Sequence, residues 1–278
     1  MLKLSALQKS QLKELGYVIV EKVFELSQIE AVKHEVKTVF FAAKNGNFYN
    51  EEITDENFMK MVFDLYANNF SAYHGAAKLA NYLPSFHQLS LLPILLSSLR
   101  ELGLAQPAIC ARPLMWFHSP KVAKNERYHR LPAHQEWSNM QGSLNGLVVW
   151  SPFVNVSADM GRLQIIPASH KLGLLPFSQN PTEDYPFAVP MHFYQEQDFQ
   201  EVAINVGDCL IFSAFLLHRS GLNISDRIRW TFNFRYNDFA EQTFIKRNFA
   251  NPFIFEANHQ LQDDFIPNAN HIKKIYEY

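Results

Sequence analysis

The chain has 278 residues, of which 47% are hydrophobic and 19% are charged. This apolar content suffices for a full hydrophobic core and excludes an intrinsically disordered chain. Lys and Arg number 25 against 27 Asp and Glu, so the formal net charge is −2 and a general nucleic-acid-binding surface is excluded. We therefore expect a folded protein that has no nucleic-acid partner.

The first part of the chain, residues 1 to about 105, shows mostly helical patterns. A short apolar strand is expected at 17–20, after a first helix-like stretch. Apolar residues then recur at helical spacing in three segments, 23–41, 57–67 and 89–104. Ser27, with Glu30 three residues later, is the expected N-cap of the first of these helices.

The pattern changes after residue 106 to β-branched and aromatic runs separated by Gly, Pro, Asn and Asp. The expected strands are 108–117, 143–156, 163–166, 202–206, 208–215 and 228–236. Strands without intervening helices predict an antiparallel barrel or jelly roll rather than a parallel α/β sheet. A long Pro-interrupted connection at 176–200 is either a lid or a plain surface loop, and the pattern leaves both open.

The domain prediction is a single domain over 1–278, because no Gly/Ser linker separates the helical and β parts. Residues 1–105 are expected to form a helical support, 106–240 a β core and 241–278 a C-terminal extension. The expected fold class is thus mostly β with flanking helices.

Location is indicated by the cysteines and the apolar segments. Cys110 and Cys209 are too few for a disulfide scaffold and are expected to be buried free thiols in a reducing compartment. The first 20 residues show no secretory signal, and the uncharged run 79–99 contains too many polar residues and prolines for a membrane span. We expect a cytoplasmic protein with no membrane partner.

Candidate metal ligands begin with His134 and Glu136. Residues two apart in a strand point to the same face, so this pair would converge without distortion of the backbone. Such a pair is expected by chance in a chain with 11 histidines and 27 acidic residues, so alone it indicates little. A third candidate, His218, ends an apolar run that starts at Gly207.

Alternation in the segment 228–236 predicts a strand with two different faces. One face carries Ile228, Trp230, Phe232, Phe234 and Tyr236, and the other carries Arg227, Arg229, Thr231, Asn233 and Arg235. An arginine that faces a pocket requires an anion, and a carboxylate is its natural bidentate partner. Two histidines, a carboxylate and a nearby arginine are the groups that a 2-oxoglutarate-dependent iron site requires.

Two segments, 134–177 (HQEW to LLPF) and 207–236 (GDCL to NFRY), together resemble the phytanoyl-CoA dioxygenase family of Fe(II)/2-oxoglutarate oxygenases. Residues 12–32 are similar to the amino-terminal segment of that family, and the likeness extends from about residue 10 to about 240. The resemblance implies a double-stranded β-helix (a jelly roll, cupin-like) with an N-terminal helical layer, and Fe(II), 2-oxoglutarate and O2 as cofactor and co-substrates.

The resemblance also implies roles for single residues. It gives His134, Glu136 and His218 as iron ligands, Arg229 rather than Arg227 as the 2-oxoglutarate anchor, Ser220 as a hydroxyl donor to the same carboxylate, and Trp150 as an aromatic beside the cofactor pocket. For Trp150 the alternative is an ordinary position in the hydrophobic core. The family's second ligand is usually Asp. Glu136 is one methylene longer, which leaves the geometry of the site open.

The expected function is therefore that of a dioxygenase that hydroxylates a small-molecule metabolite and releases succinate and CO2. Desaturation is a further option, whereas halogenation is disfavoured because Glu136 keeps the coordination position that a halide would need. Two rival hypotheses are a catalytically silent barrel that binds a small molecule or metal, and a cupin-type isomerase, for which too few histidines precede Glu136. The sequence indicates neither the substrate nor the oligomeric state.

Several nearby polar residues have weaker roles. His118, Tyr128 and His129 precede His134 and are candidates for the pocket entrance, with a solvated loop as the alternative. Ser169 and His170 are expected to stabilise a turn by hydrogen bonds rather than to bind metal. Arg112 and Trp116 share a predicted strand face and would either meet the substrate or pack.

Overall fold

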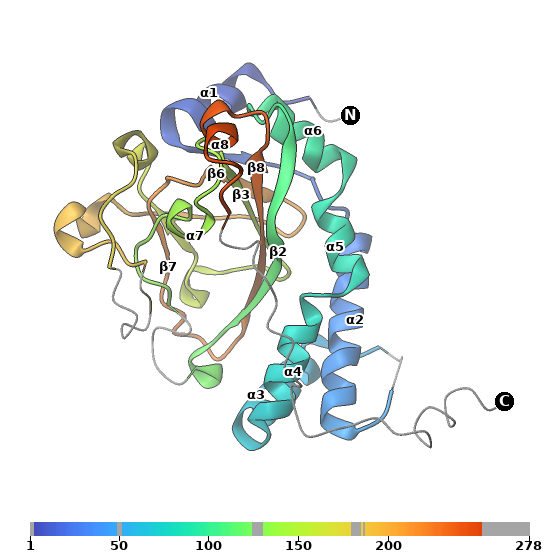
Figure 1. The fold of residues 1–278 in the computed structure, drawn as a ribbon. Coiled ribbons are helices and arrows are strands. Elements are labelled where there is room, and N and C mark those ends of the chain that lie inside the picture. Colours follow the sequence, from blue (N-terminus) through green and yellow to red (C-terminus); the bar gives the residue numbers. More distant parts are fainter. Residues whose placement is uncertain (1–2, 49–51, 124–129, 179–184, 186, 252–278) are drawn as a thin grey trace.

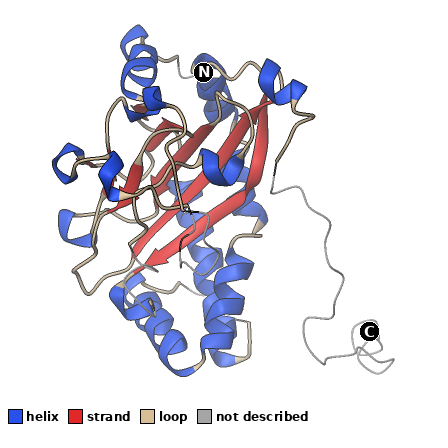
Figure 2. Ribbon diagram, turned by 60° about the vertical axis from the view of Figure 1, so that its left-hand side comes forward, coloured by secondary structure: helices blue, strands red, loops and turns tan. Residues whose placement is uncertain are grey.

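Two antiparallel sheets and a layer of helices make up the fold (Figures 1 and 2). The structure is a computed structural model, and it describes residues 3–48, 52–123, 130–178, 185 and 187–251. The larger sheet has the strand order β1-β6-β3-β8-β2 and the smaller sheet the order β5-β4-β7. The strands are β1 (Tyr17–Val20), β2 (Pro107–His118), β3 (Leu147–Pro152), β4 (Leu163–Ile165), β5 (Gln200–Val202), β6 (Cys209–Ser213), β7 (His218–Ser220) and β8 (Arg229–Asp238).

Helices α2 to α6 lie on the outer face of the larger sheet, beside β2 (Figure 1). The α-helices of the described residues are α1 (Ala6–Leu15), α2 (Leu26–Asn45), α3 (Asp55–Asn68), α4 (Phe70–Ala80), α5 (Pro84–Ser90), α6 (Pro93–Glu101), α7 (Trp137–Met140) and α8 (Gln242–Lys246). About 41% of the described residues are helical. The expectation of a mostly β protein was therefore wrong, because long connections and three-residue strands leave the β core with few strand residues.

Some element boundaries differ from those expected. The helix expected at 23–41 starts at Leu26, and its N-cap is Glu25 rather than Ser27. The Glu25 amide donates to the Gln28 side chain, so the reciprocal contact of a capping box lies two residues before the predicted one. Pro93 does interrupt the segment 89–104, since α5 ends before it and α6 begins with it.

Strand β8 lies between β3 and β2, and its ten residues are all buried. Its apolar face, with Trp230, Phe232, Phe234 and Tyr236, belongs to the hydrophobic core shared with the helices. A second hydrophobic cluster lies on the other side of the larger sheet and includes residues of β3, β4 and β6. The other face of β8 turns toward that interior, as the alternation predicted.

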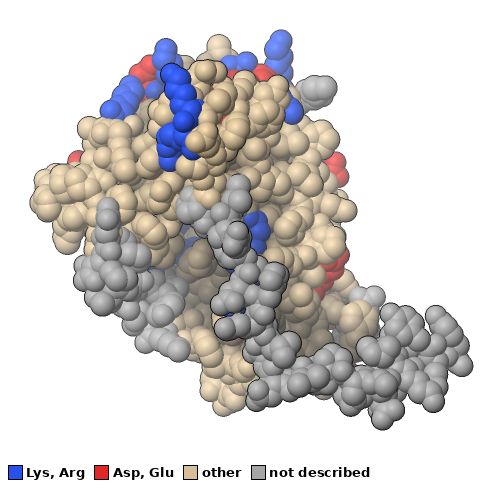
Figure 3. Space-filling model, viewed as in Figure 1, with Lys and Arg blue, Asp and Glu red and all other residues tan. Residues whose placement is uncertain are grey.

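Charged side chains are unevenly distributed over the surface of the described residues. On the face seen in Figure 3, most visible Lys and Arg side chains of the described residues lie at the end that carries α1 and α8, and the remainder is largely uncharged. Among the described residues, none of the helices combines the length and apolar character that crossing a bilayer would require.

Candidate metal centre and adjoining cavity

A cavity of about 220 Å³ opens between the two sheets. Its walls come from β2, β3, β6, β7 and β8, together with the segment before α7 and Tyr185. The residues that the sequence singled out as ligands, anchor and neighbours all line it, namely His134, Glu136, His218, Arg229, Ser220 and Trp150. Residues from both halves of the β core therefore face one space.

Three buried side chains at one end of the cavity could hold a metal ion. Ligand atoms of His134, Glu136 and His218 all lie within 4.8 Å of one another. Glu136 Oε1 is 3.9 Å from Nε2 of His134 and 3.7 Å from Nε2 of His218. One carboxylate oxygen thus faces both imidazole nitrogens.

The two histidines are joined through their backbones. The His134 amide donates to the His218 carbonyl at 2.9 Å, and the His218 amide donates to the His134 carbonyl at 3.1 Å. His134 also forms an isolated bridge with Ala188, so it extends the smaller sheet beyond β7. The relative position of the rings, with centroids 4.2 Å apart, is set by this pairing.

Both imidazoles have the tautomer that metal binding needs. Nδ1 of His134 lies 2.8 Å from the Pro132 carbonyl, and Nδ1 of His218 lies 2.9 Å from the Leu216 carbonyl. A carbonyl can only accept, so Nδ1 carries the proton and Nε2 keeps its lone pair toward the cluster. Burial and the neighbouring His134 lower the pKa of His218, which favours the neutral ring.

Glu136 reaches the cluster by a different route from the one expected. Its backbone has helical angles, φ −66° and ψ −26°, and it is the N-cap residue of α7. The assumption that 134–136 is a strand with both side chains on one face was therefore wrong. The chain turns at Glu136 into the short helix, where the Met140 amide donates to the Glu136 carbonyl at 3.0 Å, and the longer side chain extends back to the histidines.

The Glu136 carboxylate is held by Arg235 on β8. Nε of Arg235 donates to Oε2 at 2.8 Å, and Nη2 donates to Oε1 at 3.1 Å. Burial on its own would raise the pKa of Glu136, but Arg235 and the two histidines hold it well below its ordinary value. The carboxylate is therefore ionised at neutral pH and available as an anionic ligand.

Arg229 lies on the same cavity wall and is 2% exposed. Its Nη1 donates to the backbone carbonyls of Gly161 and Gly221, and its buried Nε has no hydrogen-bond partner among the described residues. Neither acceptor is an anion. Burial lowers the pKa of Arg229 to about 10, so the guanidinium is still charged at neutral pH.

Glycine is required where the backbone meets Arg229. Gly161 has a φ of +73°, and a side chain there or at Gly221 would collide with the backbone of the facing segment. The two glycines thus allow the loops after β3 and after β7 to approach each other, and both of their carbonyls meet the Arg229 guanidinium.

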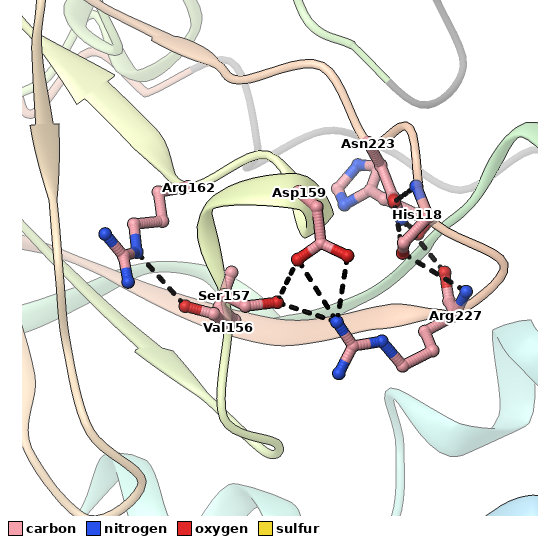
Figure 4. Close-up of polar contacts among 8 residues, drawn as sticks. His118, Val156, Ser157, Asp159, Arg162, Asn223 and Arg227 are labelled. Carbon is pink, nitrogen blue, oxygen red and sulfur yellow. Dashed lines mark hydrogen bonds and ion pairs between the residues drawn. The ribbon is translucent and has the colours of Figure 1, made fainter.

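Arg227, which strand alternation could not separate from Arg229, faces elsewhere (Figure 4). Its Nη2 donates to Asp159 Oδ2 at 3.0 Å and to Ser157 Oγ at 2.8 Å, and the Arg227 side chain is half-exposed. Asn223 links the end of β2 to the segment before β8, because its Nδ2 donates to the carbonyls of His118 and Arg227 at 3.0 and 2.9 Å. Only Arg229 of the two lines the cavity.

Comparison with known families agrees with this geometry. The family model described as phytanoyl-CoA dioxygenase (PhyH) matches residues 12–231. The chain belongs to the phytanoyl-CoA dioxygenase family. This membership and the His–Glu–His cluster confirm the expected cofactor and co-substrate, a non-haem iron ion and 2-oxoglutarate. Two nitrogen donors and one carboxylate oxygen are the set that suits iron(II) in oxygenases.

Solved structures share the fold at low sequence identity. The non-haem monooxygenase ThoJ in its apo form is 16% identical with a TM-score of 0.57, and the match covers 83% of this chain and 77% of ThoJ. EvdO2 from Micromonospora carbonacea var. aurantiaca is 12% identical (TM-score 0.51; 84% and 91% covered). EctD from S. alaskensis, solved with 2-oxoglutarate and 5-hydroxyectoine, is 17% identical (TM-score 0.50; 86% and 77% covered). A search of curated proteins found no match.

The remaining residues expected in this phytanoyl-CoA dioxygenase relative fall into three groups. Trp116 and His118 line the cavity, whereas Tyr128 and His129 lie outside the described residues. Arg112 lies within the register shift between Ala111 and Leu114, and its guanidinium is over the Tyr82 ring at 5.3 Å from the centroid.

Ser169 has the turn role expected of it and also supports the backbone next to His218, a candidate metal ligand. Its Oγ donates to the Ile166 carbonyl at 2.7 Å and accepts from the Leu217 amide at 2.9 Å. Leu217 directly precedes His218, so this hydroxyl fixes the backbone at the start of β7. His170 makes its contact with the Lys13 carbonyl at 3.1 Å, away from the metal cluster.

Sequence reasoning missed two residues of the site. Arg235 was placed on the polar face of its strand, but its pairing with Glu136 was not anticipated. Tyr185, in the connection 176–200, lies edge-on to His134 at 5.0 Å and accepts from Asn139 Nδ2 at 3.4 Å. Alternation along β8 was a signal for Arg235, whereas nothing in its neighbourhood distinguishes Tyr185 from the other aromatics of that connection.

Proposed function

We propose that the protein is an Fe(II)/2-oxoglutarate-dependent dioxygenase that hydroxylates a small-molecule metabolite and releases succinate and CO2. One observation carries the proposal: a single cavity holds a His–Glu–His cluster and also a buried arginine whose acceptors are backbone carbonyls. An uncompensated buried charge is costly, so Arg229 is best explained by an anionic ligand that enters the cavity.

The three ligand residues would hold the metal from one side. Nε2 of His134, Nε2 of His218 and Oε1 of Glu136 converge, which leaves the opposite side open to the cavity. When bound, iron(II) would supply the redox chemistry by which 2-oxoglutarate and O2 are consumed. The protein supplies the donors in their correct protonation states.

Arg229 and Ser220 would bind the distal carboxylate of 2-oxoglutarate. Arg229 presents a planar donor group that is charged at neutral pH. Ser220 follows His218 by two residues on β7, so both of these side chains face the cavity. Trp150 and Phe212 line the same cavity as apolar walls that exclude water from the bound co-substrate.

The unit that carries this activity is proposed to be one oxygenase domain over residues 1–278, because the helices and the larger sheet share a single hydrophobic cluster. Cys110 and Cys209 are both buried and free, which supports the expectation of a reducing compartment such as the cytoplasm.

The test begins with the protein, Fe(II) and 2-oxoglutarate under anaerobic conditions. The chelate should give a weak visible charge-transfer band, and admission of O2 should then release succinate in an Fe(II)-dependent manner. His134→Ala should abolish both signals. His74→Ala, which removes an exposed histidine on α4, is the matched control and should retain them.

Two results would contradict the proposal. Undiminished succinate release by His134→Ala would exclude this cluster as the iron site. Absence of the band with the unaltered protein would favour the rival hypothesis of a catalytically silent binding protein.

A further inference from the structure

Two arginines on the same face of β8 are used in opposite ways. Arg229 contacts backbone carbonyls and has an orphaned Nε, whereas Arg235 is fully engaged by one carboxylate. The Arg235 side chain is 8% exposed and that of Glu136 is 4% exposed, so the pair is shielded from water. Such a contact is costly to bury unless its geometry is good, and here it is bidentate.

Arg235 lies on β8, which is paired with a strand on each side. It lies opposite Val148 of β3 on one side and opposite Ala111 of β2 on the other. Its Nη1 donates to Asn233 Oδ1 at 3.1 Å, which fixes the plane of the guanidinium. The Arg235 guanidinium is therefore held by both Glu136 and Asn233.

Glu136, in contrast, has little support of its own. It stands at the N-cap of the four-residue helix α7, and its side chain has one more rotatable bond than the usual Asp of the family. With both carboxylate oxygens held by Arg235, Oε1 is left 3.9 and 3.7 Å from the two imidazole Nε2 atoms. The arginine supplies the constraint that the longer side chain lacks.

We propose that Arg235 is a positioning residue for the metal centre, which orients the Glu136 carboxylate so that Oε1 faces His134 and His218 and thereby adapts the site to Glu in place of Asp. This inference rests on the proposed iron site. It assigns different tasks to the two arginines: Arg235 serves the metal and Arg229 serves the co-substrate.

The alternative is that the ion pair only stabilises the fold. A purely structural pair would affect the free energy of unfolding without a specific effect on metal binding. Outer partners that orient metal ligands typically change metal affinity by about 10- to 100-fold when they are removed. Metal affinity measured in the absence of 2-oxoglutarate therefore separates the two roles.

The experiment titrates metal-free protein with Co(II), whose visible spectrum reports both binding and coordination geometry. Arg235→Gln should raise the dissociation constant by about 10- to 100-fold and change the spectrum of the bound ion. Arg227→Gln is the matched control, since it removes an arginine of the neighbouring sequence that does not line the cavity. It should leave Co(II) affinity within roughly twofold of the unaltered protein.

A double-substitution cycle with Glu136→Asp tests the contact itself. Asp is too short to keep both the arginine and the metal, so Glu136→Asp should weaken Co(II) binding when Arg235 is present. In the Arg235→Gln background the same change should have a much smaller effect, because the contact is already lost. Arg235→Lys keeps the positive charge but cannot donate two parallel hydrogen bonds to the carboxylate. Its Co(II) affinity should therefore lie between those of the unaltered protein and Arg235→Gln. If circular dichroism shows that Arg235→Gln does not fold, Arg235→Lys takes its place in the cycle.

Unchanged Co(II) affinity and spectrum in the Arg235 variants, or strictly additive effects in the cycle, would overturn the inference. Those results would leave the proposed function standing, since the unaltered protein would still bind metal. Failure of the unaltered protein to bind Co(II) at all would overturn both.

Discussion

The two faces of β8 are equally buried but have different chemistry. Trp230, Phe232, Phe234 and Tyr236 pack into the hydrophobic cluster beneath the helices, while Arg229, Thr231, Asn233 and Arg235 line the cavity. All ten residues of the strand are buried. Burial therefore does not distinguish the hydrophobic core from the candidate site. The two faces differ in whether the side chains are apolar, or polar with hydrogen-bond partners.

The difference has an energetic consequence. On the apolar face, Phe232 contacts the rings of Phe24, Phe86 and Phe153 at centroid distances of 5.3, 5.8 and 4.6 Å. On the polar face, Arg229 keeps a buried charge without a carboxylate among its described acceptors. We expect changes on the first face to lower stability and changes on the second to lower ligand binding.

The largest effect is expected for Phe232→Ala. Its side chain is fully buried among aromatic rings, so truncation should leave a cavity and cost about 3–5 kcal/mol of unfolding free energy. Urea denaturation should show a lower midpoint with an unchanged slope. A loss below about 1 kcal/mol would mean that the helical layer does not depend on this face.

Next is Arg229→Gln, on the opposite face. Removal of a buried charged donor should weaken 2-oxoglutarate binding by about 2–5 kcal/mol, because the distal carboxylate then lacks its partner. The readout is the KM for 2-oxoglutarate in succinate release, with the urea midpoint measured in parallel. A normal KM would show that the anchor lies elsewhere.

A smaller effect is expected for Tyr236→Phe. The phenol donates to the Ser90 carbonyl at 2.5 Å and ties β8 to the end of α5. Loss of one buried hydrogen bond should cost about 1 kcal/mol, visible as a small shift of the urea midpoint. A loss as large as that of Phe232→Ala would indicate that the hydrogen bond, and not the ring packing, dominates this face.

The smallest effect is expected for Arg227→Gln. Its guanidinium meets Asp159 at the surface and does not line the cavity. The KM for 2-oxoglutarate should stay within roughly twofold of the unaltered value. A large rise would reverse the assignment of the two arginines.

Alternation was the part of the sequence that predicted most. Over 228–236 it placed the aromatic residues on one face and the polar residues on the other, because a strand longer than five residues repeats its pattern often enough to be recognised. β7, with three residues, offered no such pattern, and β5 lies at 200–202 rather than 202–206. The short strands β5 and β7 exist because each pairs with β4. This pairing cannot be predicted from their own few residues.

The candidate site was partly predictable for a similar reason. His134, Glu136 and His218 were identified by type and by family resemblance, and the structure brings them together. The turn at Glu136 was missed, since a strand and a helix start are both compatible with a segment so short. The Arg235–Glu136 contact spans 99 residues of sequence, so only the folded chain reveals it.

The reciprocal amide–carbonyl bonds between His134 and His218 also bear on metal choice in the cell. These bonds fix two ligands through the main chain, so their arrangement does not depend on which ion arrives. A preformed site of nitrogen and oxygen donors follows the Irving–Williams order and holds cobalt, nickel or zinc more tightly than iron(II). For the proposed oxygenase, loading with iron would therefore depend on which metal ions the cell supplies, and binding of another metal would abolish activity without unfolding the protein.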